Sequence, residues 1–207
     1  REDPRDAFVS NLIASFAQVP QGARIGTASS RRRCQLLEQR PDLEVNVVRG
    51  NVNSRLAKLD AGNYDALVLA AAGLKRLGFD DRVSNYFEPE DMLPAVGQGI
   101  MGIECAADAD DVRALVATIA HAQTTAQVLS ERAVNLALGG GCHMPIAAYA
   151  QTSSEGQLWL RALVGAVDGT QVLRAEASGP VDEPAQLGER VGAELLSLGA
   201  SALINAQ

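Results

Sequence analysis

Aromatic side chains are scarce in this sequence, at 4% of its 207 residues. The apolar residues make up 47% of the chain and are mostly Ala, Val and Leu, which favours helices packed on sheets over an all-β sandwich. No apolar run approaches the roughly 18 residues of a membrane-spanning helix, and no signal-peptide pattern opens the sequence. We therefore expect an α/β or α+β protein that has no membrane as a partner.

Cysteine and histidine are also rare. The three cysteines, Cys34, Cys105 and Cys142, lie far apart and form no C-x-x-C pair, which fits a reducing compartment better than a disulfide framework. We therefore expect a cytoplasmic protein in which Cys34 and Cys105 belong to the core. The two histidines, His121 and His143, are too far apart and too isolated to predict a metal site, so no metal is expected.

The formal net charge of −7 argues against general binding to nucleic acid or to an anionic membrane surface. This average conceals an asymmetry along the chain. Residues 150–207 hold three arginines against seven acidic residues, whereas residues 24–55 hold seven arginines against three acidic residues. The basic stretch is therefore the part that we expect to bind anions.

Strand and helix patterns alternate over residues 6–70. This order is typical of a parallel sheet with helical crossovers. Phosphate and carboxylate ligands of such sheets bind where strands end and helices begin, because free N–H groups point there. The pattern predicts helices over 6–19, 29–37 and 52–61 and strands over 23–27, 43–48 and 65–70.

The second half of the chain is less regular at first and then changes character. Pro94, Gly97 and Gly99 predict a hinge or crossover over residues 93–99. Short turns between the last apolar runs predict antiparallel pairing and a small α+β unit. We expect helices over 70–77, 109–121, 124–138 and 185–198 and strands over 100–105, 146–151, 158–164 and 171–176.

Four arginines follow the predicted strand ends. Arg31 and Arg32 begin a helix directly after a strand, Arg49 ends the next strand, and Arg55 follows in the next helix. Guanidinium groups at one rim of a sheet would bind carboxylates in a bidentate manner. The alternative is a solvated basic face, which is what charge runs usually form.

Hydroxyl groups precede this arginine pair. Thr27, Ser29 and Ser30 could donate hydrogen bonds to an anion at the helix start. Equally, Ser29 or Ser30 could simply cap the helix. The residues alone leave both interpretations open.

A glycine-rich loop, Gly139-Gly140-Gly141-Cys142-His143-Met144-Pro145, follows the predicted helix over 124–138. Glycines allow the backbone to approach a ligand closely, and the only thiol of the loop stands between them and Pro145. The loop would therefore be a rigid mount for a covalent attachment. A glycine cap followed by a small buried cysteine explains the same pattern.

Several short motifs occur in an order and at spacings that chance would not produce. They are Arg1-Glu2-Asp3-Pro4-Arg5-Asp6, Gly26-Thr27 with Arg31-Arg32 and Gln35-Leu36, Arg49-Gly50-Asn51-Val52 with Arg55-Leu56, Ala72-Gly73-Leu74-Lys75-Arg76-Leu77-Gly78, Leu93-Pro94-Ala95-Val96-Gly97-Gln98-Gly99, Glu131-Arg132 and Gly140-Gly141-Cys142. Together they resemble the porphobilinogen deaminase family, also called hydroxymethylbilane synthases. The resemblance extends over essentially the whole chain.

The resemblance implies that Cys142 carries a dipyrromethane cofactor through a thioether bond. In this family, four porphobilinogen molecules are added head to tail to the cofactor with loss of ammonia, and water releases hydroxymethylbilane. Each pyrrole carries an acetate and a propionate, so the resemblance gives the arginines a reason. It implies cofactor contacts for Arg31, Arg32, Arg49 and Arg55, supporting contacts for Thr27, Ser29 and the Gly50 backbone, and substrate contacts for Arg76 and Arg132.

Two departures from the family pattern stand near the arginine pair. Ala28 replaces a usual serine and Ser30 a usual leucine, which removes one potential hydroxyl group. Further along, Ala147 stands where glycine is common, which we expect to be a mild change.

The resemblance also implies a missing part, because the family chain begins with a further stretch that forms most of a first domain and holds the catalytic aspartate. We therefore expect a periplasmic-binding-protein-like α/β domain with a parallel or mixed sheet over residues 4–92, and a return segment of the first domain over 96–120. A small α+β domain with a three-stranded antiparallel sheet would follow over 121–207. No acid here can be assigned the role of the family aspartate.

We expect the isolated chain to have little or no activity, and a separate N-terminal fragment of the same enzyme to be its partner, beside the substrate porphobilinogen. The alternative is a non-catalytic anion-binding module that keeps the fold and the arginines without the covalent cofactor.

Overall fold

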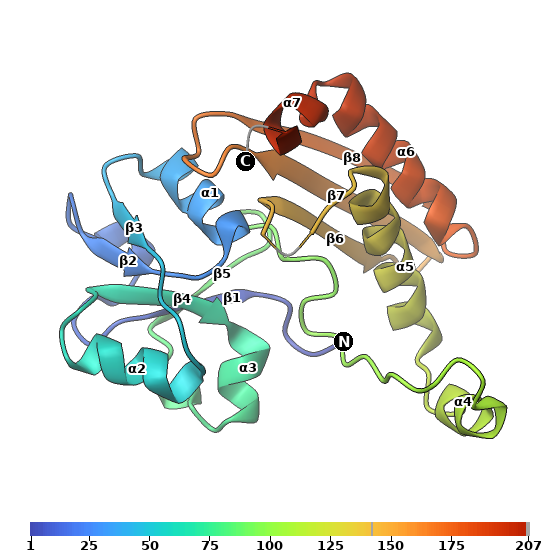
Figure 1. The fold of residues 1–207 in the computed structure, drawn as a ribbon, viewed down its shortest axis with the longest axis horizontal. Coiled ribbons are helices and arrows are strands. Elements are labelled where there is room, and N and C mark those ends of the chain that lie inside the picture. The colour runs from blue at the N-terminus through green and yellow to red at the C-terminus, as the bar shows by residue number, and fades with distance from the viewer. Residues whose placement is uncertain (142, 206–207) are drawn as a thin grey trace.

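Two β-sheets, each with its own helices, form the two halves of the molecule (Figure 1). The computed structural model describes residues 1–141 and 143–205. A long irregular connection runs between the halves and carries one short helix that projects from the body (Figure 1). In the described ranges, no helix is long and apolar enough to cross a membrane.

The first half is built on a five-stranded mixed sheet with the order β3-β2-β4-β1-β5. The three strands predicted over 23–27, 43–48 and 65–70 are confirmed, and they pair in parallel. The two outer strands on the other side are antiparallel to their neighbours. The strands are β1 (Asp6–Val9), β2 (Arg24–Gly26), β3 (Glu44–Asn46), β4 (Ala66–Ala70) and β5 (Asn85–Phe87).

The helix predicted over residues 6–19 is wrong. The chain forms β1 and then a short 3-10 helix, η1 (Phe16–Gln18). β1 lies between two other strands, and all four of its residues are buried because both faces of the sheet are covered. A strand buried on both faces has no alternating pattern, and its apolar run merged with the later Ile13 and Phe16 into apparent helical spacing.

Helices cover both faces of this sheet. Phe8 and Ile25 pack on one face against Leu36 of α1 (Ser30–Gln39). Ala7 and Leu67 pack on the other face with α2 (Val52–Asp60) and α3 (Ala71–Arg76). The predicted helices over 29–37, 52–61 and 70–77 are confirmed, and together they leave the carboxyl ends of β2, β3 and β4 at one edge.

A short 3-10 helix, η2 (Asp80–Arg82), precedes β5 in the first half, and the connection between the halves contains the helix α4 (Asp110–Ala117). The strand predicted over 100–105 does not form, because the described part of the chain places no strand beside it. Met101 is 72% exposed and Ile103 is 53% exposed. α4 confirms the helix predicted over 109–121, but its apolar residue Leu115 is 71% exposed.

The second half is an antiparallel three-stranded sheet with the order β6-β7-β8, as predicted. Two long helices cover one face of it and bury Val134, Leu160 and Val191 between them. The predicted helices over 124–138 and 185–198 are therefore confirmed. The elements are α5 (Ala122–Ala137), β6 (Ile146–Thr152), β7 (Gln157–Gly165), β8 (Val172–Pro180), α6 (Pro184–Ser197) and α7 (Ala200–Asn205).

The two halves meet where the other face of this sheet approaches α1. Leu93 of the connection packs against Tyr149 and Leu163. Arg174 of β8 donates to both carboxylate oxygens of Glu38 in α1, at 2.7 and 2.5 Å. The turn between β7 and β8 lies beside α1 (Figure 1), so the helix that begins with the arginine pair is held by the second half.

Candidate anion-binding site

The start of α1 is fixed by the two hydroxyl residues that precede the arginine pair. Ser29 is the N-cap, and its side-chain oxygen accepts a hydrogen bond from the backbone N–H of Arg32. The buried Thr27 hydroxyl accepts from the backbone N–H of Ser29 at 3.3 Å. The structure therefore gives both residues a capping role, which sets the direction in which the following side chains leave the helix.

Arg31 and Arg32 point into the protein and share the carboxylate of Asp6. Arg31 donates to the two Asp6 oxygens at 2.8 and 3.1 Å, and Arg32 donates through Nε at 2.8 Å. Asp6 is fully buried, and Arg31 and Arg32 are 3% and 8% exposed. The solvated basic face is therefore wrong for these two arginines, although their ligand role stays a prediction.

Attraction between opposite charges explains how Asp6, Arg31 and Arg32 can be ionised although all three are buried. Burial alone would raise the pKa of Asp6, but the charges and hydrogen bonds of Arg31 and Arg32 bring that pKa below its ordinary value. Burial lowers the pKa of Arg32, Asp6 opposes this, and the charges of Arg31 and Arg55 lower it further. Asp6 is therefore held as a carboxylate between two guanidinium groups.

Arg49 and Arg55 lie in the loop after β3 and in the first turns of α2. Arg55 Nε donates to the Gly50 carbonyl oxygen at 2.8 Å. Gly50 has a φ of 116°, and a side chain there would overlap Ser54, so this tight turn requires glycine. Within the described residues, neither arginine has a carboxylate partner, and the Arg55 terminal nitrogens make no hydrogen bond. Two cations therefore remain available to a ligand.

Arg76 and Arg132 do not join this group in the structure. Arg76 ends α3 and lines a hollow with Lys75 and Met101. Arg132 lies on α5 and lines a different hollow with Arg113. Both are exposed and, in the part of the chain that the structure describes, neither forms an ion pair. Their substrate role remains a prediction.

Cys142 lies outside the described residues. The structure therefore describes only the neighbours of this predicted cofactor-bearing residue. α5 ends at Leu138, and Gly139 follows with a φ of 62°, as a glycine cap requires. The Asn135 side chain donates to the Gly140 carbonyl oxygen at 3.2 Å, and the Gly140 N–H donates to the Asn135 carbonyl oxygen at 2.8 Å. The loop is thus tied to α5 on the side that leads into the cysteine.

Three further polar residues join the segments that cross between the halves, and the sequence reasoning gave none of them a role. Besides Asp6, these are Gln98 and Glu131. Gln98 donates to Asp6 at 2.9 Å and to the Pro4 carbonyl oxygen at 2.6 Å. Asp6, Gln98 and Glu131 all stand in motifs that carried the resemblance, so their place in those motifs was the available signal.

The structure also places the two other cysteines and His121. Cys34 is buried, as predicted, and burial raises the pKa of its thiol to about 12. Cys105 is only half-buried, so its core prediction is wrong, because the strand that would have covered it does not form. His121 caps α5 by accepting the backbone N–H of Thr124 at 3.3 Å.

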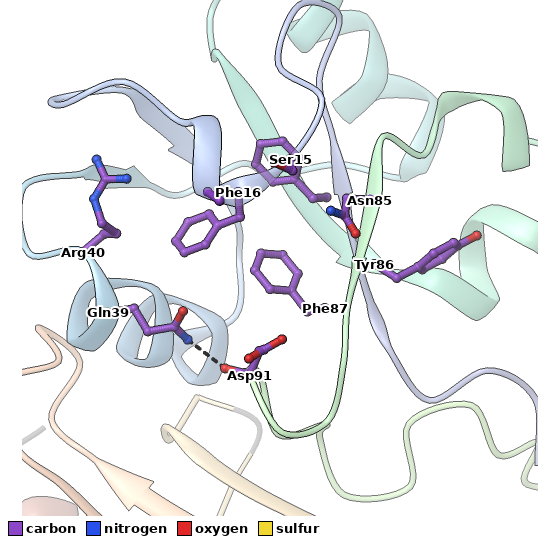
Figure 2. Close-up of a pocket in the computed structure, with 10 residues that line it drawn as sticks. Ser15, Phe16, Gln39, Arg40, Asn85, Tyr86, Phe87 and Asp91 are labelled. Atoms are coloured by element: carbon purple, nitrogen blue, oxygen red, sulfur yellow. Dashed lines mark hydrogen bonds between the residues drawn. The ribbon is translucent and has the colours of Figure 1, made fainter.

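A pocket of about 490 Å³ lies at the other end of α1 (Figure 2). The rings of Phe16 and Phe87 lie next to each other, tilted by 59° with centroids 5.2 Å apart, and Gln39 donates to the Asp91 carbonyl oxygen at 2.7 Å (Figure 2). The pocket has an apolar floor, and the one arginine that lines it, Arg40, is paired with Asp42. None of the predicted site residues lines it, so it does not suit a ligand that is rich in carboxylates.

Comparison with known families agrees with this arrangement. The family model described as porphobilinogen deaminase, dipyromethane cofactor binding domain, matches residues 1–114. The model described as porphobilinogen deaminase, C-terminal domain, matches residues 125–197. The first match alone covers more than half of the 207 residues. The chain belongs to the porphobilinogen deaminase family.

Proposed function

We propose that this chain is the part of a hydroxymethylbilane synthase that holds the dipyrromethane cofactor and binds its carboxylates. Its family places it in tetrapyrrole biosynthesis among the transferases. The observation that carries the finer proposal is the position of the cations. Arg31 and Arg32 follow the carboxyl end of β2, and Arg49 and Arg55 follow that of β3, so one edge of the sheet gathers them.

The residues present fit a ligand of this kind. A linear pyrrole chain gains an acetate and a propionate with each added unit, so its site must neutralise a growing negative charge. Arg49 and Arg55 have no carboxylate partner among the described residues, and they follow β3, the parallel neighbour of the strand that leads into Arg31 and Arg32. Guanidinium groups bind carboxylates in a bidentate manner and stay charged at any working pH.

In this proposal, Cys142 Sγ forms the thioether bond, and the glycine-rich loop from Gly139 to Gly141 gives the attached group room. When bound, the dipyrromethane supplies the pyrrole carbon to which the first substrate unit is joined. The residues of this chain bind and orient carboxylates. Arg31, Arg32, Arg49 and Arg55 would hold the cofactor, Thr27, Ser29 and the Gly50 backbone would support them, and Arg76 and Arg132 would contact substrate.

The proton chemistry of the reaction is assigned to no residue here. We propose that a separate N-terminal fragment supplies it and covers residues 96–120, which would complete its fold. The exposure of Met101 (72%), Leu115 (71%) and Ile119 (68%) supports this, because such apolar side chains in one segment mark a surface that another protein part covers. The isolated chain should then have little or no activity.

The test combines mass and activity. The chain is produced with and without the N-terminal part, and intact mass together with the colour that Ehrlich's reagent gives after acid treatment reports a bound dipyrromethane. We expect an adduct and hydroxymethylbilane formation only in the presence of the N-terminal part. Cys142→Ala should abolish both, whereas Cys105→Ala, which changes another accessible thiol, should leave both in place.

A non-catalytic anion-binding module is the second candidate, since the arginines alone would suffice for it. An unmodified Cys142 in the presence of the N-terminal part, with porphobilinogen still bound, would favour the module over the enzyme.

A further inference from the structure

Among the residues that the structure describes, Asp6 is the one acidic group that contacts both arginines at the start of α1. It comes from β1, an inner strand of the sheet, and all three of its hydrogen bonds with Arg31 and Arg32 are 2.8 to 3.1 Å long. Its carboxylate neutralises one of the two positive charges. The pair therefore keeps a net positive charge at the sheet edge while its orientation is fixed from inside the protein.

The two arginines are not held equally. The terminal nitrogens of Arg31 bind Asp6, the Leu93 carbonyl oxygen at 2.7 Å and Gln98 at 3.3 Å, so both of them are occupied. Arg32 binds Asp6 through Nε at 2.8 Å, and its Nη2 lies 2.8 Å from the same carboxylate oxygen. Its Nη1 makes only a contact of 3.5 Å with the Val68 carbonyl oxygen, which leaves this nitrogen with capacity for a further acceptor.

Arg55 follows the same edge of the sheet. It lies in α2, which comes after β3, the parallel neighbour of the strand that leads into Arg32, and its terminal nitrogens have no partner in the described residues. A ligand along this edge that carries several carboxylates would meet both guanidinium groups. Without Asp6, Arg32 would lose the hydrogen bond that fixes its Nε side, and two buried cations would repel each other.

We propose that Asp6 is a positioning residue that anchors Arg31 and fixes Arg32 at the sheet edge, so that Nη1 of Arg32 receives a carboxylate of the bound pyrrole chain. This inference rests on the proposed function. Arg31 then acts mainly through Asp6 and the crossover segments, and Arg32 contacts the ligand. Gln98 assists, because its amide group donates to Asp6 and accepts from both arginines.

The neighbouring amide allows a sharp test, since Gln98 Nε2 lies 2.9 Å from Asp6. Asp6→Asn removes the carboxylate, and the double variant Asp6→Asn/Gln98→Glu returns one to the same two guanidinium groups. Asp65→Asn is the matched control, because Asp65 pairs with Arg24 at 3.0 Å at the other end of the sheet. Porphobilinogen binding to the 207-residue chain is measured by equilibrium dialysis with Ehrlich's reagent.

We expect Asp6→Asn to weaken binding about tenfold or more, which corresponds to about 1.4 kcal/mol, and the double variant to recover most of this loss. Asp65→Asn should bind like the unchanged chain. NMR signals of the arginine side chains give a second readout: slowed rotation of the Arg31 and Arg32 guanidinium groups should be lost in Asp6→Asn and retained in Asp65→Asn.

Three results would overturn the inference. A folded Asp6→Asn chain that binds as tightly as the unchanged chain would show that the anchor is only structural. A double variant that binds no better than Asp6→Asn, or that fails to fold when Asp6→Asn also fails, would show that the carboxylate is not what positions the arginines. If the unchanged chain takes up no porphobilinogen, the proposed function fails as well, which distinguishes this result from the other two.

Discussion

Arg1 and Glu131 form a buried ion pair although they are 130 residues apart in the sequence. The Glu131 carboxylate also accepts from the backbone N–H groups of Gly97 at 2.7 Å and Ala150 at 2.9 Å. Burial raises the pKa of Glu131, and the bonds from Arg1 and the two backbone groups oppose this rise. One carboxylate therefore joins the N-terminal segment, the crossover and the sheet of the second half.

Glu131→Gln should destabilise the chain by about 3 to 5 kcal/mol, because it leaves the Arg1 charge without its partner in a buried place. Urea unfolding measures the free energy. Glu90→Gln is the control, since Glu90 also joins the two halves, through Arg161 at 2.8 Å, but is exposed. We expect less than about 1 kcal/mol for the control. Equal losses for the two variants would contradict the junction role of Glu131.

Gly169 provides a test of how the second half holds α1. It has a φ of 73° in the turn between β7 and β8, and a Cβ atom there would overlap the backbone of Leu37 and Glu38. Gly156 has a φ of 70° in the turn between β6 and β7 and has nothing within 4 Å. The two positions share the backbone strain of a substitution and differ only in the contact with α1.

Gly156→Ala should therefore cost about 1 kcal/mol, and Gly169→Ala at least about 2 kcal/mol more, because overpacking is added to the same strain. Thermal or urea unfolding would give both values. Similar losses at the two glycines would mean that the turn does not press on α1.

The sequence predicted where the arginines of the candidate site lie better than it predicted what they contact. The arginines after β2 and β3 were found from strand ends, because the carboxyl ends of parallel strands meet at one edge. The pairing with Asp6 was not predicted, because Asp6 lies in β1, a strand that the sequence pattern predicted as a helix. An inner strand buried on both faces has no period that could reveal its register.

The connection between the halves shows a second limit. Residues 100–105 have the apolar composition of a strand, but a strand needs a neighbour for its backbone groups, and the described chain offers none there. Cys105, predicted in the core, is half-exposed for the same reason. Local pattern thus predicted the crossover over residues 93–99 and the helix α4 correctly, whereas pairing and burial depend on which segments lie alongside.

Cysteine reactivity should follow these positions. Burial raises the pKa of Cys34 to about 12, and the thiolate is the reactive form, so Cys34 should stay unmodified by iodoacetamide at pH 8 in the folded chain. Cys105 is half-buried and should react. Peptide mass spectrometry measures both, and unfolding in urea should make the two thiols equally reactive. Fast modification of Cys34 in the folded chain would contradict its burial.

Asp6 should also leave a signature in the acid unfolding of the chain. Its pKa in the folded protein lies below the ordinary value, because the opposing effect of burial is outweighed by Arg31 and Arg32. A depressed carboxyl pKa contributes stability that is fully present above the unfolded value of about 3.9 and is lost as the pH falls through the folded pKa. The free energy of unfolding should therefore fall with pH below about 4, more steeply in the unchanged chain than in Asp6→Asn.

The matched comparison is with Asp80→Asn, which removes an exposed carboxylate of the same half that forms no ion pair with any described residue. Urea unfolding at several pH values between about 5 and 2 gives the slopes, and Asp80→Asn should keep the slope of the unchanged chain. Because ∂ΔG/∂pH counts the protons taken up on unfolding, a slope that Asp6→Asn leaves unchanged would mean that Asp6 titrates alike in both states. The two guanidinium groups would then not hold its charge.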